Sequence, residues 1–248
     1  MASHIRAISL LLLLVSTWPG AAMADPIAEA VRVHDTGDYA RAFKLLHPLA
    51  QKGDPRAQHI LGEWYDGGNT GTKEYITLSV KKARHWYEKS AAQNYKPGVR
   101  ALGAYLTGHG IEVMRGYRIL LTMAEAGDAR AQALLGNFIA TRANEEYPER
   151  YRIPGTAADG LAWLHKAANQ KDNIAAYALR FYHWRYGTKA EQYYWELITA
   201  ALMKSRLPMA APNIRDELTK KQRTDVERRA AAWLKARGVT PVHRVESK

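Results

Sequence analysis

The 248-residue chain contains no cysteine. Disulfide bridges, thiol catalysis and cysteine-ligated zinc are therefore excluded, and packing must stabilise the folded state. The sequence also lacks a Gly-x-Ser-x-Gly nucleophile elbow, a His-Glu-x-x-His zinc motif, a phosphate-cradling glycine loop and an EF-hand loop. We therefore expect no catalytic residues, no cofactor and no metal, and a protein that is not an enzyme.

The chain also lacks an apolar run of about 20 residues, the length needed to cross a bilayer. The first 24 residues instead combine a basic start at Arg6, a short apolar run over 7–15, and small residues Ala22 and Ala24 at the −3 and −1 positions of a cleavage site. This pattern predicts a signal peptide over 1–24, cut between Ala24 and Asp25. The expected location is the periplasm, and the mature chain is not expected to span the membrane.

Acidic residues are scarce relative to basic ones. The chain has 36 Lys and Arg against 24 Asp and Glu, a formal net charge of +12. Such a charge attracts acidic proteins, anionic lipid headgroups or peptidoglycan-associated polymers over long range, although it is also compatible with an ordinary solvated surface. Export would separate the protein from nucleic acid, so we expect no nucleic-acid partner.

Two short phrases recur along the chain. The first has a small residue followed four and five positions later by Leu-Gly. The second carries small or apolar residues around a Trp, which Ile119 replaces in one copy, with the spacing of one helix face. Turn-forming Gly and Pro residues separate them, and no period-2 run appears. The first phrase occurs at Ala57-Gln-His-Ile-Leu61-Gly62, Gly98-Val-Arg-Ala-Leu102-Gly103, Ala131-Gln-Ala-Leu-Leu135-Gly136 and Ala175-Ala-Tyr-Ala-Leu179-Arg180, and the second at Ala83–Ala92, Gly116–Gly127, Gly160–Ala168 and Tyr194–Ala201.

The recurrence predicts repeated helix–loop–helix units. Short side chains let two helices approach closely, and large aromatic residues fill the gaps between units. Since no unit can bury its apolar face alone, neighbouring units should stack into a solenoid. A further helix over Asn213–Gly238 would cap the array.

These phrases resemble the Sel1-like repeat of the TPR-like superfamily, whose pattern is Ala-x-x-x-Leu-Gly-x-x-Tyr-x-x-Gly followed by Ala-x-x-Trp-x-x-Lys-Ala-Ala-x-x-Gly. The segment Ala57–Asn94 matches best, and Arg180 departs from the pattern where Gly is expected. The resemblance implies an all-α fold, an α/α solenoid of helix–turn–helix repeats with a C-terminal capping helix. The expected organisation is a helix pair in 25–54, about four repeats in 55–205 (55–95, 96–127, 128–171 and 172–205), a capping helix in 206–238 and a loose tail in 239–248.

The resemblance also suggests where a partner would bind. If the first helix of each unit lines the concave face, as in TPR proteins, residues at −5, −2, +2 and +5 from the repeat Leu would face inward. We expect an aromatic stripe to hold a partner segment, with Arg and charged residues beside it, while the alternative is that later helices cover these rings as core. The candidate partner-binding residues are Tyr177, Phe181, Trp184, Arg100, Arg130, His59 and Glu63.

The sequence gives weaker evidence for a metal site or for acid–base catalysis. His59 and Glu63 lie one helical turn apart, which suits a metal, but no third ligand can be named and such pairs are common on solvated helix faces. Candidate acid–base pairs such as Asp159 and His165 do not converge in an evident cleft.

The leading expectation is thus a periplasmic protein–protein interaction module: an adaptor, a regulator or an immunity-like binder of an envelope or secreted protein. Its partner would be a protein or peptide segment, and the net positive charge favours an acidic one. The alternative is an envelope-structural protein that binds peptidoglycan or anionic lipid through its basic surface. A hydrolase with an unrecognised site is a third class, and the sequence does not give the oligomeric state.

Overall fold

The structure, a computed structural model, describes residues 25–67, 78–143, 153–204 and 211–241. Within these ranges the chain forms twelve α-helices and no strand, which confirms the predicted all-α class. None of the described helices is long and apolar enough to cross a membrane. The helices are α1 (Pro26–Asp35), α2 (Tyr39–Gln51), α3 (Pro55–Asp66), α4 (Val80–Ala92), α5 (Lys96–Gly108), α6 (Val113–Glu125), α7 (Ala129–Arg142), α8 (Ala157–Asn169), α9 (Asn173–Tyr186), α10 (Lys189–Met203), α11 (Ala211–Asp216) and α12 (Lys220–Ala236).

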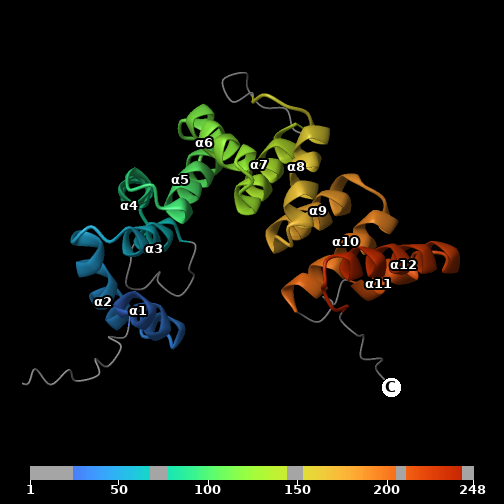
Figure 1. The fold of residues 1–248 in the computed structure, drawn as a ribbon, viewed down its shortest axis with the longest axis horizontal. Coiled ribbons are helices and arrows are strands. Elements are labelled where there is room, and N and C mark those ends of the chain that lie inside the picture. The colour runs from blue at the N-terminus through green and yellow to red at the C-terminus, as the bar shows by residue number, and fades with distance from the viewer. Residues whose placement is uncertain (1–24, 68–77, 144–152, 205–210, 242–248) are drawn as a thin grey trace, which may run out of the picture.

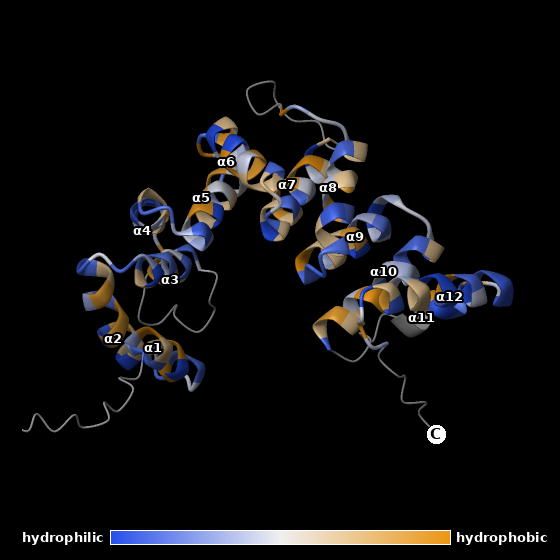
Figure 2. Cartoon of the chain, viewed as in Figure 1, coloured by the Kyte–Doolittle hydropathy of each residue, from blue (hydrophilic) through white to orange (hydrophobic). Residues whose placement is uncertain are grey.

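The helices follow one another in antiparallel pairs that build an arch (Figure 1). Each first helix packs on its own pair-mate, and the first helices of the central pairs also contact one another: α3 contacts α5, α5 contacts α7 and α7 contacts α9. Apolar residues concentrate where helices meet, and hydrophilic residues turn outward (Figure 2). The predicted α/α solenoid is therefore confirmed, and α3, α5, α7 and α9 form a continuous inner layer.

Three of the tight turns between the pairs share one local signature. A residue with positive φ precedes an aspartate whose carboxylate caps the next helix, as at Gly53, Gly127 and Lys171 (φ 100°, 87° and 66°). The following residues, Asp54, Asp128 and Asp172, accept hydrogen bonds from backbone N–H groups in the first turns of α3, α7 and α9. The left-handed residue reverses the chain and the carboxylate satisfies helix donors that have no partner within the helix.

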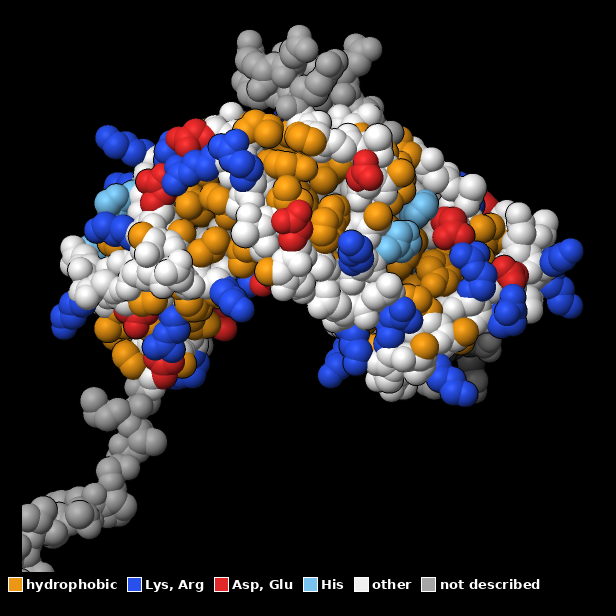
Figure 3. Space-filling model, turned by 45° about the horizontal axis from the view of Figure 1, so that its top comes forward, with side chains coloured by type: hydrophobic (Ala, Val, Ile, Leu, Met, Phe, Trp, Pro, Cys, Tyr) orange, Lys and Arg blue, Asp and Glu red, His pale blue; other side chains and the backbone are white. Residues whose placement is uncertain are grey.

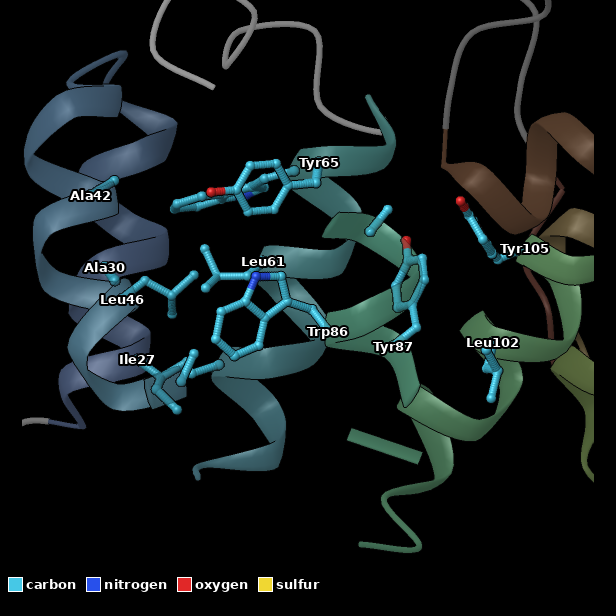
Figure 4. Packing of buried hydrophobic residues seen from close by; sticks show 14 of the residues in the cluster. Ile27, Ala30, Ala42, Leu46, Leu61, Tyr65, Trp86, Tyr87, Leu102 and Tyr105 are labelled. Carbon is cyan, nitrogen blue, oxygen red and sulfur yellow. The ribbon is translucent and has the colours of Figure 1, made fainter. Parts of the chain in front are cut away.

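The buried core repeats from unit to unit, in step with the sequence repeat. The Leu residues of the first phrase are buried in every unit, none more than 4% exposed. Figure 4 shows Leu61 and Trp86 pointing toward Leu46, where α2, α3 and α4 meet. At the other end, the rings of Trp195 and Trp233 contact each other at a centroid distance of 6.2 Å. Aromatic side chains thus fill the spaces between helices, as the sequence predicts. The repeated Leu residues are Leu61, Leu102, Leu135 and Leu179.

Small residues mark the closest helix approaches. A Cβ atom on Gly160 of α8 would lie 2.4 Å from the backbone nitrogen of Ala140 and 2.7 Å from the carbonyl oxygen of Gly136 in α7. The same geometry recurs in the preceding pair, where a Cβ atom on Gly116 would lie 2.7 Å from the carbonyl oxygen of Gly103. The repeated glycines therefore serve the close contact within each pair that the sequence predicts.

The fourth unit replaces this contact with an ion pair. Arg180, which stands where the other units have Gly, places its Nη1 atom 3.3 Å from both carboxylate oxygens of Glu196 on α10. The Glu196 side chain is only 2% exposed. Thus α9 and α10 are joined by a buried charge pair, where the α5–α6 and α7–α8 pairs use backbone proximity.

The prediction of a single C-terminal capping helix over Asn213–Gly238 is wrong in one respect. The chain forms two helices, α11 and α12, because Thr219 interrupts them with a capping box: its hydroxyl accepts from the Gln222 N–H, and the Gln222 side chain accepts from the Thr219 N–H. Val226 and Leu234 of α12 are buried, Leu234 in the core cluster that includes α9 and α10. The predicted signal peptide over 1–24 and most of the tail over 239–248 lie outside the described residues.

Candidate functional site

Three aromatic side chains project from α9 without being covered. Tyr177, Phe181 and Trp184 are 48%, 44% and 60% exposed, and we call them the aromatic stripe. The rings of Phe181 and Trp184 contact each other at a centroid distance of 5.4 Å. The alternative that α10 or α12 buries these rings as ordinary core is therefore wrong. Three large rings exposed on one helix are unusual for a surface that meets only water.

Two hollows lie beside the aromatic stripe. The hollow between α5 and α7 has a volume of about 230 Å³, and the hollow between α7 and α9 has a volume of only about 20 Å³. Both are lined by Asn137 and Thr141 of α7, so they are adjacent parts of one groove. The α5–α7 hollow is also lined by Ala104, Thr107, Gly108, Leu120, Leu134, Phe138 and Arg142, and the α7–α9 hollow by Ala140, Leu164, Ala178, Phe181, Tyr182, Arg185 and Tyr186.

The groove is aromatic and basic. Its described lining holds two arginines and no carboxylate. The Arg142 guanidinium lies 4.9 Å from the centre of the Phe138 ring, and that of Arg185 lies 5.4 Å from the centre of the Tyr186 ring. Lys and Arg side chains also border the opening of the arch (Figure 3). Stacked arginines beside exposed rings offer both apolar area and charge to a bound molecule.

Arg100 and Arg130 each form an ion pair between neighbouring repeats. Arg100 donates to Asp128 at 2.9 Å, and Arg130 donates to Asp172 at 2.8 Å. Each arginine thus reaches from the first helix of one unit to the aspartate that caps the first helix of the next. The two ion pairs join neighbouring repeats, and any steering of an acidic partner by these residues stays a prediction.

His59 and Glu63 lie on α3, far along the inner layer from the aromatic stripe. The His59 Nε2 atom is 3.6 Å from a Glu63 carboxylate oxygen. Burial lowers the pKa of His59 to about 4, and the positive charge of Arg100 acts in the same direction. Burial, together with the nearby Asp66 carboxylate, raises the pKa of Glu63. No group of three or more metal-ligating side chains occurs within the described ranges.

Comparison with known proteins bears on the fold. No family model and no curated protein matches the chain. Among solved structures, a protective antigen present in uropathogenic Escherichia coli strains, which displays an SLR fold, superposes with a TM-score of 0.54 at 18% sequence identity. The match covers 90% of this chain and 50% of that one, so this chain spans half the length of the antigen. A Sel1 repeat protein from Oxalobacter formigenes matches with a TM-score of 0.47 at 16% identity, over 83% of this chain and 99% of that one.

The chain has the Sel1-like repeat fold. Within this fold the predicted inward register needs one correction. Ala133 and Ala140, at the −2 and +5 positions from Leu135 and therefore expected to face inward, are 0% and 1% exposed and belong to the core. The packing of α7 between its neighbours covers them. Besides Ala140, the α7 residues that line the groove are Leu134, Asn137, Phe138, Thr141 and Arg142, of which the predicted register included only Asn137.

The residues that the sequence reasoning missed share a signal. Thr141 and Arg142 on α7, and Tyr182 and Arg185 on α9, all lie in the last two turns of a first helix. The sequence register stopped at the +5 position from the repeat Leu. Thr141 and Arg142 stand at +6 and +7 from Leu135, and Tyr182 and Arg185 at +3 and +6 from Leu179, so all four lie outside the −5, −2, +2 and +5 register.

Proposed function

We propose that the chain is an exported, periplasmic protein–protein interaction module whose inner surface binds a segment of another protein. The exposure of the aromatic stripe on α9 beside the groove carries this proposal. Aromatic and Arg side chains are the residues that most often dominate binding energy at interfaces. An adaptor, a regulator of an envelope protein and an immunity-like binder of a secreted toxin would all use such a surface.

The rigidity of the stripe supports binding. The Arg180 guanidinium lies 4.6 Å from the centre of the Tyr177 ring, and the same guanidinium is fixed by buried Glu196. Phe181 and Trp184 contact each other. Side chains that are already ordered lose less conformational entropy when a partner docks, so more of the contact energy appears as affinity.

Affinity capture tests the proposal. The chain from Asp25 onward serves as bait in native envelope extract, beside a Tyr177→Ala/Trp184→Ala variant. A matched control, Val31→Ala/Met203→Ala, removes two exposed apolar side chains (38% and 49% exposed) from other helices. We expect the stripe variant to lose a protein that the wild type and the control both retain. Unchanged capture by a stripe variant with a wild-type melting curve would contradict the proposed site, and fractionation of cells would test the periplasmic location.

The second candidate is an envelope-structural protein that binds peptidoglycan or anionic lipid. The observation that favours it is the net charge of +12. Salt separates the two candidates, because screening weakens contacts between exposed charges far more than contacts between buried apolar groups. Retention on peptidoglycan or on anionic vesicles that vanishes in high salt, together with no stripe-dependent protein capture, would favour the structural role.

A further inference from the structure

We propose that the aromatic stripe binds an α-helix of the partner protein, which packs along α9 as the first helix of a fifth repeat would. This inference rests on the proposed function and specifies the conformation and the contact face of the bound segment. The bound helix continues the interface by which α9 itself packs on α7.

The position two residues before the repeat Leu faces the next first helix in each of the first three units. In the first unit, the centre of the His59 ring lies 6.0 Å from that of Tyr95, the residue that precedes α5. In the second, Arg100 donates to Asp128, which caps α7. In the third, Ala133 is 0% exposed, in a core cluster that includes residues of α9.

The position five residues after the repeat Leu faces the same way. The Nε2 atom of His109, which follows α5, lies 2.7 Å from a carboxylate oxygen of Asp66 on α3. Thr107 lines the hollow between α5 and α7, and Ala140 lines the hollow between α7 and α9. In α3, α5 and α7, both positions thus belong to the contact with the next first helix.

In the fourth unit, the same two positions carry Tyr177 and Trp184, which are 48% and 60% exposed. The helices that follow, α11 and α12, pack on α10 (Figure 1). In the described part of the chain, no helix therefore covers this side of α9. The stripe is a repeat-to-repeat face, and in the preceding units an α-helix occupies that face.

The spacing of the exposed side chains also favours a helix as the occupant. Together with Ile174 and Phe181, which are 40% and 44% exposed, the stripe residues stand three, four and three positions apart. This spacing keeps them in one row along α9, over about 15 Å. A second helix that packs at a small crossing angle lies along such a row, as in coiled coils. A partner helix of about three turns would contact the whole row.

The stripe side chains determine which helix face fits. Where α7 has Ala133 and Ala140, α9 has Tyr177 and Trp184. Packed helix axes lie about 8–10 Å apart, so a helix that meets large rings must present small side chains toward them. Neither position of α9 is charged, unlike the corresponding positions of α3 and α5. The partner helix therefore presents an uncharged, apolar face with small residues at its centre.

Fluorescence anisotropy with synthetic peptides and the full chain tests the inference. The probe is a labelled helical peptide of zero net charge, with alanines three, four and three residues apart, leucines beside them, and Glu and Lys elsewhere. One comparison peptide carries a central proline, which breaks the helix, and another has the same composition in scrambled order. We expect the helical peptide to bind tightest and to gain helicity by circular dichroism. High salt should change its affinity by less than about twofold, because the contact is uncharged.

Substitutions on two sides of α9 locate the site. Trp184→Ala and Tyr177→Ala should each weaken binding at least about tenfold, since central aromatic anchors dominate such interfaces. Tyr186→Ala is the matched control, because Tyr186 is 39% exposed on the same helix but lines the hollow toward α7. We expect this control to leave the affinity within about twofold, as a side chain outside the contact contributes little. Trp184→Lys serves as a substitute if Trp184→Ala has an altered melting curve.

Three results would overturn the inference. Equal binding of either comparison peptide would show that the helical row is not recognised. A loss with Tyr186→Ala as large as that with Trp184→Ala would place binding in the hollow toward α7. Absence of binding by the helical peptide at millimolar concentration would also contradict it. If envelope-protein capture still depends on Tyr177 and Trp184 in these cases, the proposed function stands and only the helical occupant is wrong.

Discussion

The close approach of α7 and α8 yields a sharp prediction for Gly160→Ala. The added methyl group would lie 2.4 Å from the backbone nitrogen of Ala140, 2.7 Å from the carbonyl oxygen of Gly136 and 2.8 Å from the Ala140 Cα atom. All three obstacles are backbone atoms, so no side chain can rotate away. The two helices must therefore separate along their whole contact.

Two opposing effects set how much Gly160→Ala changes the free energy of unfolding. Overpacking of a well-filled interior typically costs about 1–3 kcal/mol, and backbone obstacles favour the upper end. Replacing Gly by Ala within a helix returns about 1 kcal/mol through helix propensity. We therefore expect Gly160→Ala to lower the free energy of unfolding by about 2 kcal/mol.

Gly108→Ala is the matched control. Gly108 ends α5, and a Cβ atom there would meet no heavy atom within 4 Å. The same chemical change should be neutral or stabilise the protein by a few tenths of a kcal/mol, because only helix propensity acts. Urea unfolding followed by circular dichroism measures both variants, with the midpoint and slope compared to detect any loss of cooperativity along the array. Wild-type stability of Gly160→Ala would refute the steric account of the repeated glycines.

Two further predictions concern buried charges. Arg180→Met should lower the free energy of unfolding by about 3 kcal/mol, because it leaves the Glu196 carboxylate buried without its partner. The double variant Arg180→Met/Glu196→Met should recover most of that loss; a double variant as unstable as the single one would argue against the ion pair as the cause. Since the pKa of His59 is about 4 in the folded chain and about 6.5 when unfolded, the unfolded chain binds more protons between these values. Stability should therefore fall as the pH drops from about 6.5 to 4, by about 3 kcal/mol from this residue, and His59→Gln should flatten the pH dependence measured by urea unfolding.

Much of the fold could be predicted from local patterns. The spacing of Leu61-Gly62 and its later copies indicates helix faces, because burial imposes the same period on every repeat. The C-terminal break could also have been found, since Thr219 and Gln222 form a capping-box pattern. The sequence reasoning followed the apolar period across this point and overlooked the capping signal.

The candidate site was harder to predict from the sequence than the fold. The exposure of Trp184 depends on whether a later helix covers α9, and helical spacing is the same for a core ring and a surface ring. The partners of Arg100 and Arg130 lie 28 and 42 residues away in sequence. Such pairs form only because each repeat brings its capping aspartate beside the preceding first helix.

The amino-acid sequence by itself determined the helices, their pairing and the repeat, because those follow from short-range periodicity and from small residues at fixed positions. Only the tertiary structure decided which side chains remain exposed: it buries Ala133 and Ala140, leaves the aromatic stripe uncovered, and places Arg142 and Arg185 beside adjoining hollows. The physical reason is that burial depends on how successive repeats stack in space, a relation between residues far apart in the chain.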